Sequence, residues 1–265
     1  MVDLVVFPIF VTLILRNRMT AKKITILIVL FFLSSGAKSQ RSVTHQKLVW
    51  YGYFLTLQFN EKWYLQTEIQ ERHFIDPVAQ HQFLVRSHIH RTLGSSGLEV
   101  STGFCAFLQN PNDPNSTSKL TVPELRPHVE VAYKQKFKVL TLDHRYRTEA
   151  RFYHNTNTTR TELADGYDFG NFRFRYNLQA TIPVWKIDDK RAFKLKAGDE
   201  IHLTSKSKTN RNIFDQNRIY AGVSVDAKPN LTFDVGYLNW FQKRPADDYF
   251  NRNIIRFAAY QKIKI

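Results

Sequence analysis

The feature that most constrains this chain is a period-two alternation of apolar and charged residues, which recurs in many segments after residue 40. In the clearest segment, 171–182, Phe172 and every second residue after it is apolar or aromatic, while Asn171 and its alternates are polar or charged. Successive side chains of a β-strand point to opposite faces, so such a segment forms a strand with one apolar and one charged face. After residue 40 the sequence shows neither helical spacing of apolar residues nor an apolar run of 18 residues. The pattern therefore predicts an all-β protein.

The number and spacing of the strands indicate a barrel. Eleven candidate strands, each of roughly 10–16 residues, extend from Lys47–Phe59 to Asn253–Ile265. Short turns alternate with long polar loops, which we expect at 109–121, 154–170, 205–212 and 242–251. Tilted membrane strands need about 9–11 residues, and alternating short turns and long loops are typical of transmembrane barrels. We predict a single transmembrane antiparallel up-and-down β-barrel of 10–12 strands.

The eleven candidate strands are an odd number, whereas single-chain bacterial barrels normally contain an even number of strands. We therefore expect that one strand is missed, split or mistaken. On the same reasoning the first candidate starts at the long-loop rim, and residues 40–47 are expected to thread the lumen.

The N-terminal region predicts export. The basic pair Lys22-Lys23 precedes the apolar run Ile24–Leu33, and Ala37-Lys38-Ser39 forms a small-x-small cleavage site before Gln40. This order is that of a secretory signal peptide, and the apolar run is too short to cross a bilayer as a helix.

A second apolar run lies upstream, in residues 1–18, and Met19 follows where a signal peptide should start. We predict that translation begins at Met19; a two-pass N-terminal anchor is the alternative. The expected organisation is a signal peptide region at 1–39 and an outer-membrane barrel at 40–265.

The orientation of the two faces decides between a membrane barrel and a soluble one. In lipid every backbone polar group must be paired within the protein, which demands a closed sheet and places the charged face in the lumen. Acids and bases on nearly every strand allow pairing there. The predicted lumen charge network comprises Glu68, Arg72, Arg86, Glu130, Arg145, Arg147, Glu149, Arg173, Arg175, Glu200 and Arg218. The alternative is a soluble lipocalin-like or sandwich protein, whose apolar face points inward.

Several segments carry a family resemblance by their order and spacing. They are Glu68–Arg72, Gln82–Arg86, His144–Glu149, Arg173–Tyr176, Asp199-Glu200 and Phe214–Arg218. Together they resemble the uncharacterised family of Gram-negative outer-membrane barrels known as domain of unknown function 2490, from about Leu48 to the C-terminus. The resemblance implies an outer-membrane barrel and no known activity.

Charge limits the partners that we expect. The formal charge is +15, and residues 1–39 carry five basic residues and one acidic residue, so about +11 belongs to the barrel. Nucleic-acid binders gather Lys and Arg in one patch, whereas here basic residues are dispersed and interleaved with acids. We expect outer-membrane lipid as the partner and no nucleic acid, and the sequence identifies no protein partner.

Three functional classes remain. A lumen filled by its own ion pairs gives a structural barrel, while an excess of inward arginine favours a small conduit for anions. A lipid-modifying hydrolase is the alternative, but no Gly-x-Ser-x-Gly motif is present and no catalytic residue is predicted. His88 and His90, two residues apart on one strand face, can chelate a metal; such pairs are common by chance, so no metal or other cofactor is expected. The single cysteine, Cys105, excludes a multi-thiolate site.

Overall fold

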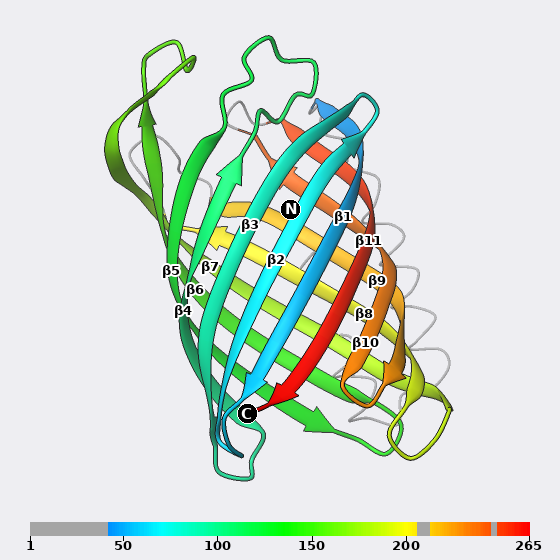
Figure 1. The fold of residues 1–265 in the computed structure, drawn as a ribbon. Helices are drawn as coiled ribbons and strands as arrows, with labels where there is room; N and C mark the ends of the chain where they lie inside the picture. Colours follow the sequence, from blue (N-terminus) through cyan, green and yellow to red (C-terminus); the bar gives the residue numbers. More distant parts are fainter. Residues whose placement is uncertain (1–41, 206–212, 245–247) are drawn as a thin grey trace, which may run out of the picture. The chain divides into compact units, whose positions relative to one another are not determined.

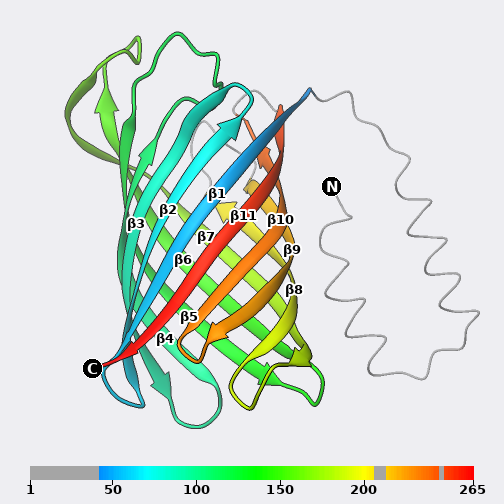
Figure 2. The same ribbon diagram turned by 45° about the vertical axis from the view of Figure 1, so that its right-hand side comes forward.

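The computed structural model describes residues 42–205, 213–244 and 248–265, which form eleven β-strands closed into a barrel (Figures 1 and 2). The predicted closed all-β barrel of 10–12 strands is therefore confirmed. The described residues contain no apolar helix long enough to cross a membrane. The predicted signal peptide and the start at Met19 lie outside the described residues. The strands are β1 (Val43–Gln58), β2 (Trp63–Ile75), β3 (Val78–Leu93), β4 (Leu98–Gln109), β5 (Val122–Lys136), β6 (Thr141–Thr156), β7 (Leu163–Lys186), β8 (Ala192–Thr204), β9 (Phe214–Lys228), β10 (Leu231–Lys243) and β11 (Tyr249–Lys264).

The barrel closes through one parallel pair, β1 with β11, and every other neighbouring pair is antiparallel. Sixteen residue pairs join the two strands, from Val43↔Tyr249 to Gln58↔Lys264, and they lie side by side in Figure 2. Consecutive antiparallel strands alternate in direction, so an odd number of them leaves the first and last running the same way.

Two expectations based on an even strand number are wrong. No strand was missed or split among the described residues, since the eleven candidates correspond to eleven strands of one sheet. Residues 43–47 do not thread the lumen, because they belong to β1 and pair with β11. The parallel closure satisfies the backbone of both strands, and this removes the sheet edges without an even count.

The connections alternate between two rims, as the sequence predicts. Short turns follow β1, β3, β5, β7 and β9, and the C-terminus lies at the same rim (Figure 1). The opposite, long-loop rim carries the β4–β5 loop and the β6–β7 hairpin. The predicted loop 154–170 is largely strand, because β6 continues to Thr156 and β7 starts at Leu163, so that a hairpin projects beyond the barrel wall.

Charged side chains lie on the inner face of the sheet and large apolar side chains on its outer face. Charged residues such as Glu149 (0% exposed) and Arg252 (0%) lie inside, whereas Val129 at the middle of β5 is 58% exposed. Every strand presents a large apolar side chain outward, and one example from each, in chain order, is Tyr51, Ile69, Ile89, Phe104, Val129, Tyr146, Phe174, Leu195, Ile219, Val235 and Phe257. The barrel thus buries charge and exposes an apolar band, the reverse of a soluble fold.

Candidate functional site: the lumen of the barrel

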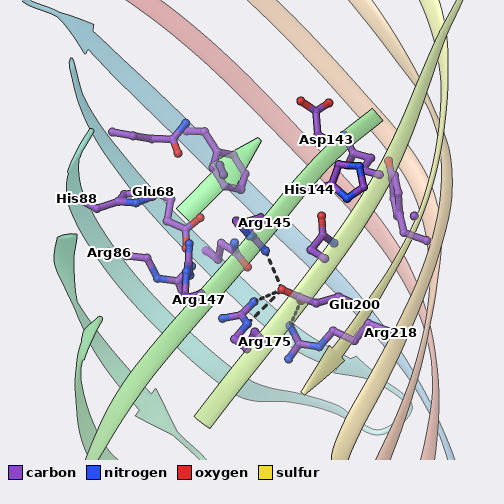
Figure 3. A pocket seen from close by; sticks show the side chains of 18 of the residues that line it. Glu68, Arg86, His88, Asp143, His144, Arg145, Arg147, Arg175, Glu200 and Arg218 are labelled. Carbon is purple, nitrogen blue, oxygen red and sulfur yellow. Dashed lines mark hydrogen bonds and ion pairs between the residues drawn. The ribbon is translucent and has the colours of Figure 1, made fainter. Parts of the chain in front are cut away.

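The lumen holds a charged cavity of about 540 Å³ (Figure 3). Its lining begins at mid-barrel with Arg86 and Arg173 and continues to residues at the short-turn rim, such as Gly97 and Lys134. Nine arginines and two lysines of the described residues line it, against four carboxylates. This excess of cationic side chains makes the cavity suited to anions.

Glu200 on β8 is the centre of the largest ion-pair group (Figure 3). One carboxylate oxygen, Oε1, accepts hydrogen bonds from Arg145 Nη2 at 2.7 Å and from Arg175 Nη2 at 2.7 Å. The second oxygen, Oε2, lies 2.9 Å from His202 Nε2 and 3.8 Å from Arg218 Nη1. These partners come from β6, β7, β8 and β9, so one carboxylate joins four consecutive strands on the inner face of the wall.

Three other glutamates also form ion pairs with arginines in the lumen. Glu149 accepts a hydrogen bond from Arg175 at 2.7 Å, and Glu130 accepts one from Arg147 at 2.7 Å. Glu68 pairs with Arg86. Each of these pairs joins two adjacent strands, because side chains on the same face of neighbouring strands are close. Removing one partner of such a pair leaves a buried charge without compensation.

All eleven residues of the predicted charge network are buried or line the lumen cavity. Two of them depart from the predicted ion pairing. Arg72 bonds to Gln82 at 2.7 Å and Gln70 at 2.7 Å and stacks 3.9 Å from the Trp50 ring centroid. Arg218 lies 4.8 Å from the Trp240 ring centroid, in addition to its distant contact with Glu200. Arg72 therefore combines amide hydrogen bonds with aromatic stacking, whereas Arg218 combines a long ion pair with stacking.

An apolar layer lies between the cavity and the long-loop rim. The rings of Trp50 and Trp240 meet edge-on at 5.6 Å, and His81 on β3 lies 5.8 Å from Trp240 on β10. Three strands separate β3 from β10 around the wall, so this contact crosses the lumen. Arg252 stacks on Trp240 at 4.3 Å. The buried members of this cluster are Leu48, Trp50, Phe74, Tyr220, Leu238, Trp240 and Ile254.

The β4–β5 loop completes this closure from above. Asn112 Oδ1 accepts a hydrogen bond from Arg252 Nη2 at 2.9 Å and lies 3.1 Å from His81 Nε2. Its backbone carbonyl accepts a hydrogen bond from Gln46 Nε2 at 2.8 Å. Through Asn112 the loop thus bonds to β1, β3 and β11 at the long-loop rim.

Replacing Asn112 by alanine is expected to lower the free energy of unfolding by about 0.5–1.5 kcal/mol, because Arg252 and His81 each lose a hydrogen-bond partner, although Asn112 is itself exposed and Arg252 retains Gln46 and Gln242. Urea unfolding in detergent micelles measures this loss. Asn115→Ala, in the same loop and exposed, is the matched control and is expected to change stability little. Equal effects of both substitutions would contradict the proposed role of Asn112.

The inward apolar cluster was missing from the sequence prediction. Its signal lies in β1, where Leu48, Trp50 and Phe54 alternate with Val49 and Tyr51. Both faces of that strand are apolar, a pattern that indicates packing on both sides. The Arg126–Glu124 and Arg151–Glu124 pairs were also not predicted as network members, although their alternation follows the same period.

The family model described as Protein of unknown function (DUF2490) matches residues 48–251. No curated protein matches the chain. No solved structure matches it either.

Proposed function

We propose that this chain, which belongs to the DUF2490 family of proteins of unknown function, is an integral outer-membrane barrel with a closed lumen. The role that we propose for it is structural and non-enzymatic. One observation carries the proposal. All eleven strands expose large apolar side chains outward while the charged side chains are buried inside. The predicted secretory signal supports export to the outer membrane.

The experiment is expression from Met19 in a Gram-negative host, followed by membrane fractionation. We expect the mature protein in the outer membrane, with its N-terminus at or near Gln40. On SDS gels the unheated sample is expected to migrate differently from the heated one, since a closed barrel with full backbone pairing resists SDS. A mature chain that remains soluble and monodisperse without any amphiphile would overturn the membrane assignment.

The proposed closed lumen rests on the layer around Trp240, His81 and Arg252, to which Asn112 of the β4–β5 loop is hydrogen-bonded. These side chains occupy the path between the cavity and the long-loop rim, so we expect no steady ion conductance.

A small conduit for anions is the second candidate, favoured by the excess of arginine in the cavity. Planar-bilayer recording separates the two. The wild-type barrel is expected to be silent, and the double variant Trp240→Ala/Arg252→Ala is expected to open an anion-selective path. Steady anion-selective current through the wild type would favour the conduit and reject the closed lumen.

A lipid-modifying hydrolase gains no support from side-chain geometry. In the part of the chain that the structure describes, no hydrogen bond joins a serine hydroxyl to a histidine ring, the contact that activates a serine nucleophile.

A further inference from the structure

Three histidines converge in the lumen wall on the side of β3, β4 and β5. The register aligns His88 on β3 with Gly103 on β4 and His128 on β5. One row closer to the short-turn rim, His90 aligns with Ser101 and Glu130 in the same manner. The middle strand contributes only small residues, so side chains of its two neighbours can meet across it.

Gly103 is essential to this arrangement. A Cβ atom at Gly103 would lie 2.4 Å from His88 Cβ and 2.3 Å from the Ser87 carbonyl oxygen. The absence of a side chain allows the His88 and His128 rings to approach to 5.5 Å, while the His88 and His90 rings lie 4.3 Å apart. Each of the three histidines is 4% exposed.

In His90 and His128 only one ring nitrogen, Nδ1, has a hydrogen-bond partner. His90 Nδ1 bonds to Glu99 Oε1 at 2.7 Å, and His128 Nδ1 lies 3.3 Å from the Arg126 carbonyl oxygen. Their Nε2 atoms are buried and unpartnered, and so are both ring nitrogens of His88. A carboxylate or carbonyl on Nδ1 fixes the tautomer with its proton there, which leaves Nε2 with a free lone pair.

The geometry points to a binding site for a divalent transition-metal ion such as Zn²⁺, formed by His88, His90 and Glu130, with His128 as the adjacent fourth donor. One ligand atom from each of the first three residues lies within 4.8 Å of the others. Bonds of about 2.0–2.1 Å around one tetrahedral ion place its ligands roughly 3.4 Å apart, so small side-chain rotations complete the site. Imidazole and carboxylate are ligands that Zn²⁺ takes in proteins.

Charges of both signs surround this position. Arg86 and Arg147 lie within electrostatic reach of His88; Arg86 pairs with Glu68, and Glu130 pairs with Arg147 and lies 3.7 Å from Arg145. Neutral imidazole donors and one carboxylate must therefore hold the ion against these arginines. Both arginine contacts of Glu130 are to Oε2, so Oε1 is the oxygen available to the metal.

Supporting groups and an entry path are present as well. Tyr64 donates a hydrogen bond to Glu99 at 2.5 Å and stacks on His90 at 4.3 Å, which holds that ring in place. His88 and Glu99 line the cavity that continues to the short-turn rim, which gives an ion access to the site.

The test uses the mature barrel, purified in detergent and stripped with EDTA. Calorimetric titration with Zn²⁺ is expected to show one ion per barrel with a Kd of about 10 µM or tighter. Co²⁺, which occupies the same ligand sets, is expected to give the visible absorption of a tetrahedral site. Absence of 1:1 binding by the wild type overturns the proposal.

Variants assign the ligands. His88→Gln, His90→Gln and His128→Gln are each expected to weaken Zn²⁺ binding at least about 100-fold, and Glu99→Gln, which removes an outer partner, about 10–100-fold. His144→Gln is the matched control, because His144 on β6 lines the same cavity and lies outside this cluster. A loss of binding in His144→Gln equal to that in the three variants would reject the assignment.

A further variant separates ligation from a structural role. His128→Cys retains a ligand atom and is expected to bind Co²⁺ with an added sulfur-to-cobalt charge-transfer band in the near ultraviolet. Heat-modifiable migration reports whether each variant is folded. A folded His128→Cys barrel that binds Co²⁺ without this band would exclude His128 as a ligand, and the Zn²⁺ titration of the wild type decides the site itself.

Discussion

Replacement of Glu200 by glutamine is expected to lower the free energy of unfolding of the barrel by about 3–5 kcal/mol, because it leaves buried cations without their shared counter-charge. Arg145 and Arg175 both bond to this carboxylate at 2.7 Å, and His202 lies 2.9 Å from it. Glutamine has nearly the same volume, so the loss reports charge compensation rather than a cavity. Urea unfolding in phospholipid vesicles, followed by the fluorescence of the four tryptophans, measures it.

The controls for this prediction use a second ion pair and a double-mutant cycle. Asp188 and Arg191 form an exposed pair at 2.7 Å in the β7–β8 turn, and Asp188→Asn is expected to change stability little. A cycle combining Glu200→Gln with Arg145→Gln isolates the coupling between the two groups, which is expected to be favourable. A loss below about 1 kcal/mol in Glu200→Gln would place the pair among weak surface bridges and contradict the buried network.

Replacement of Val129 by arginine is expected to destabilise the barrel in vesicles by about 2–4 kcal/mol, because a cationic side chain at the bilayer midplane must leave water. Val129 lies at the middle of β5 and is 58% exposed, so the substitution causes no clash inside the protein. On a soluble barrel the same exposed position would tolerate arginine within about 0.5 kcal/mol. The measurement therefore tests which solvent contacts the apolar face.

The control is an arginine substitution at a different depth in the proposed membrane. Val139→Arg lies in the β5–β6 turn, where the side chain is 64% exposed, and is expected to cost about 0–1 kcal/mol at the membrane interface. Equal and small effects of Val129→Arg and Val139→Arg would contradict a membrane position for β5.

The metal site shows the limit of sequence reasoning. Two of its donors, His88 and His90, were visible as a pair on one strand face, and a pair alone gives no reason to expect a metal. The third and fourth donors, His128 and Glu130, are contributed by β5, about 40 residues away, and Gly103 on the intervening strand allows the contact. Strand register across three strands, which alternation does not encode, determines this convergence.

The sequence by itself determined the all-β fold, a strand number of 10–12, the alternation of short turns and long loops, and which charged residues share one face of a strand, because period-two alternation acts within a single strand. Only the tertiary structure decided how the sheet closes, with β1 parallel to β11, since this pairing joins segments about 200 residues apart. The tertiary structure also decided which charges meet and where Trp50 and Trp240 fill the lumen. Such contacts depend on register and on the diameter of the closed barrel, which are properties of all strands together.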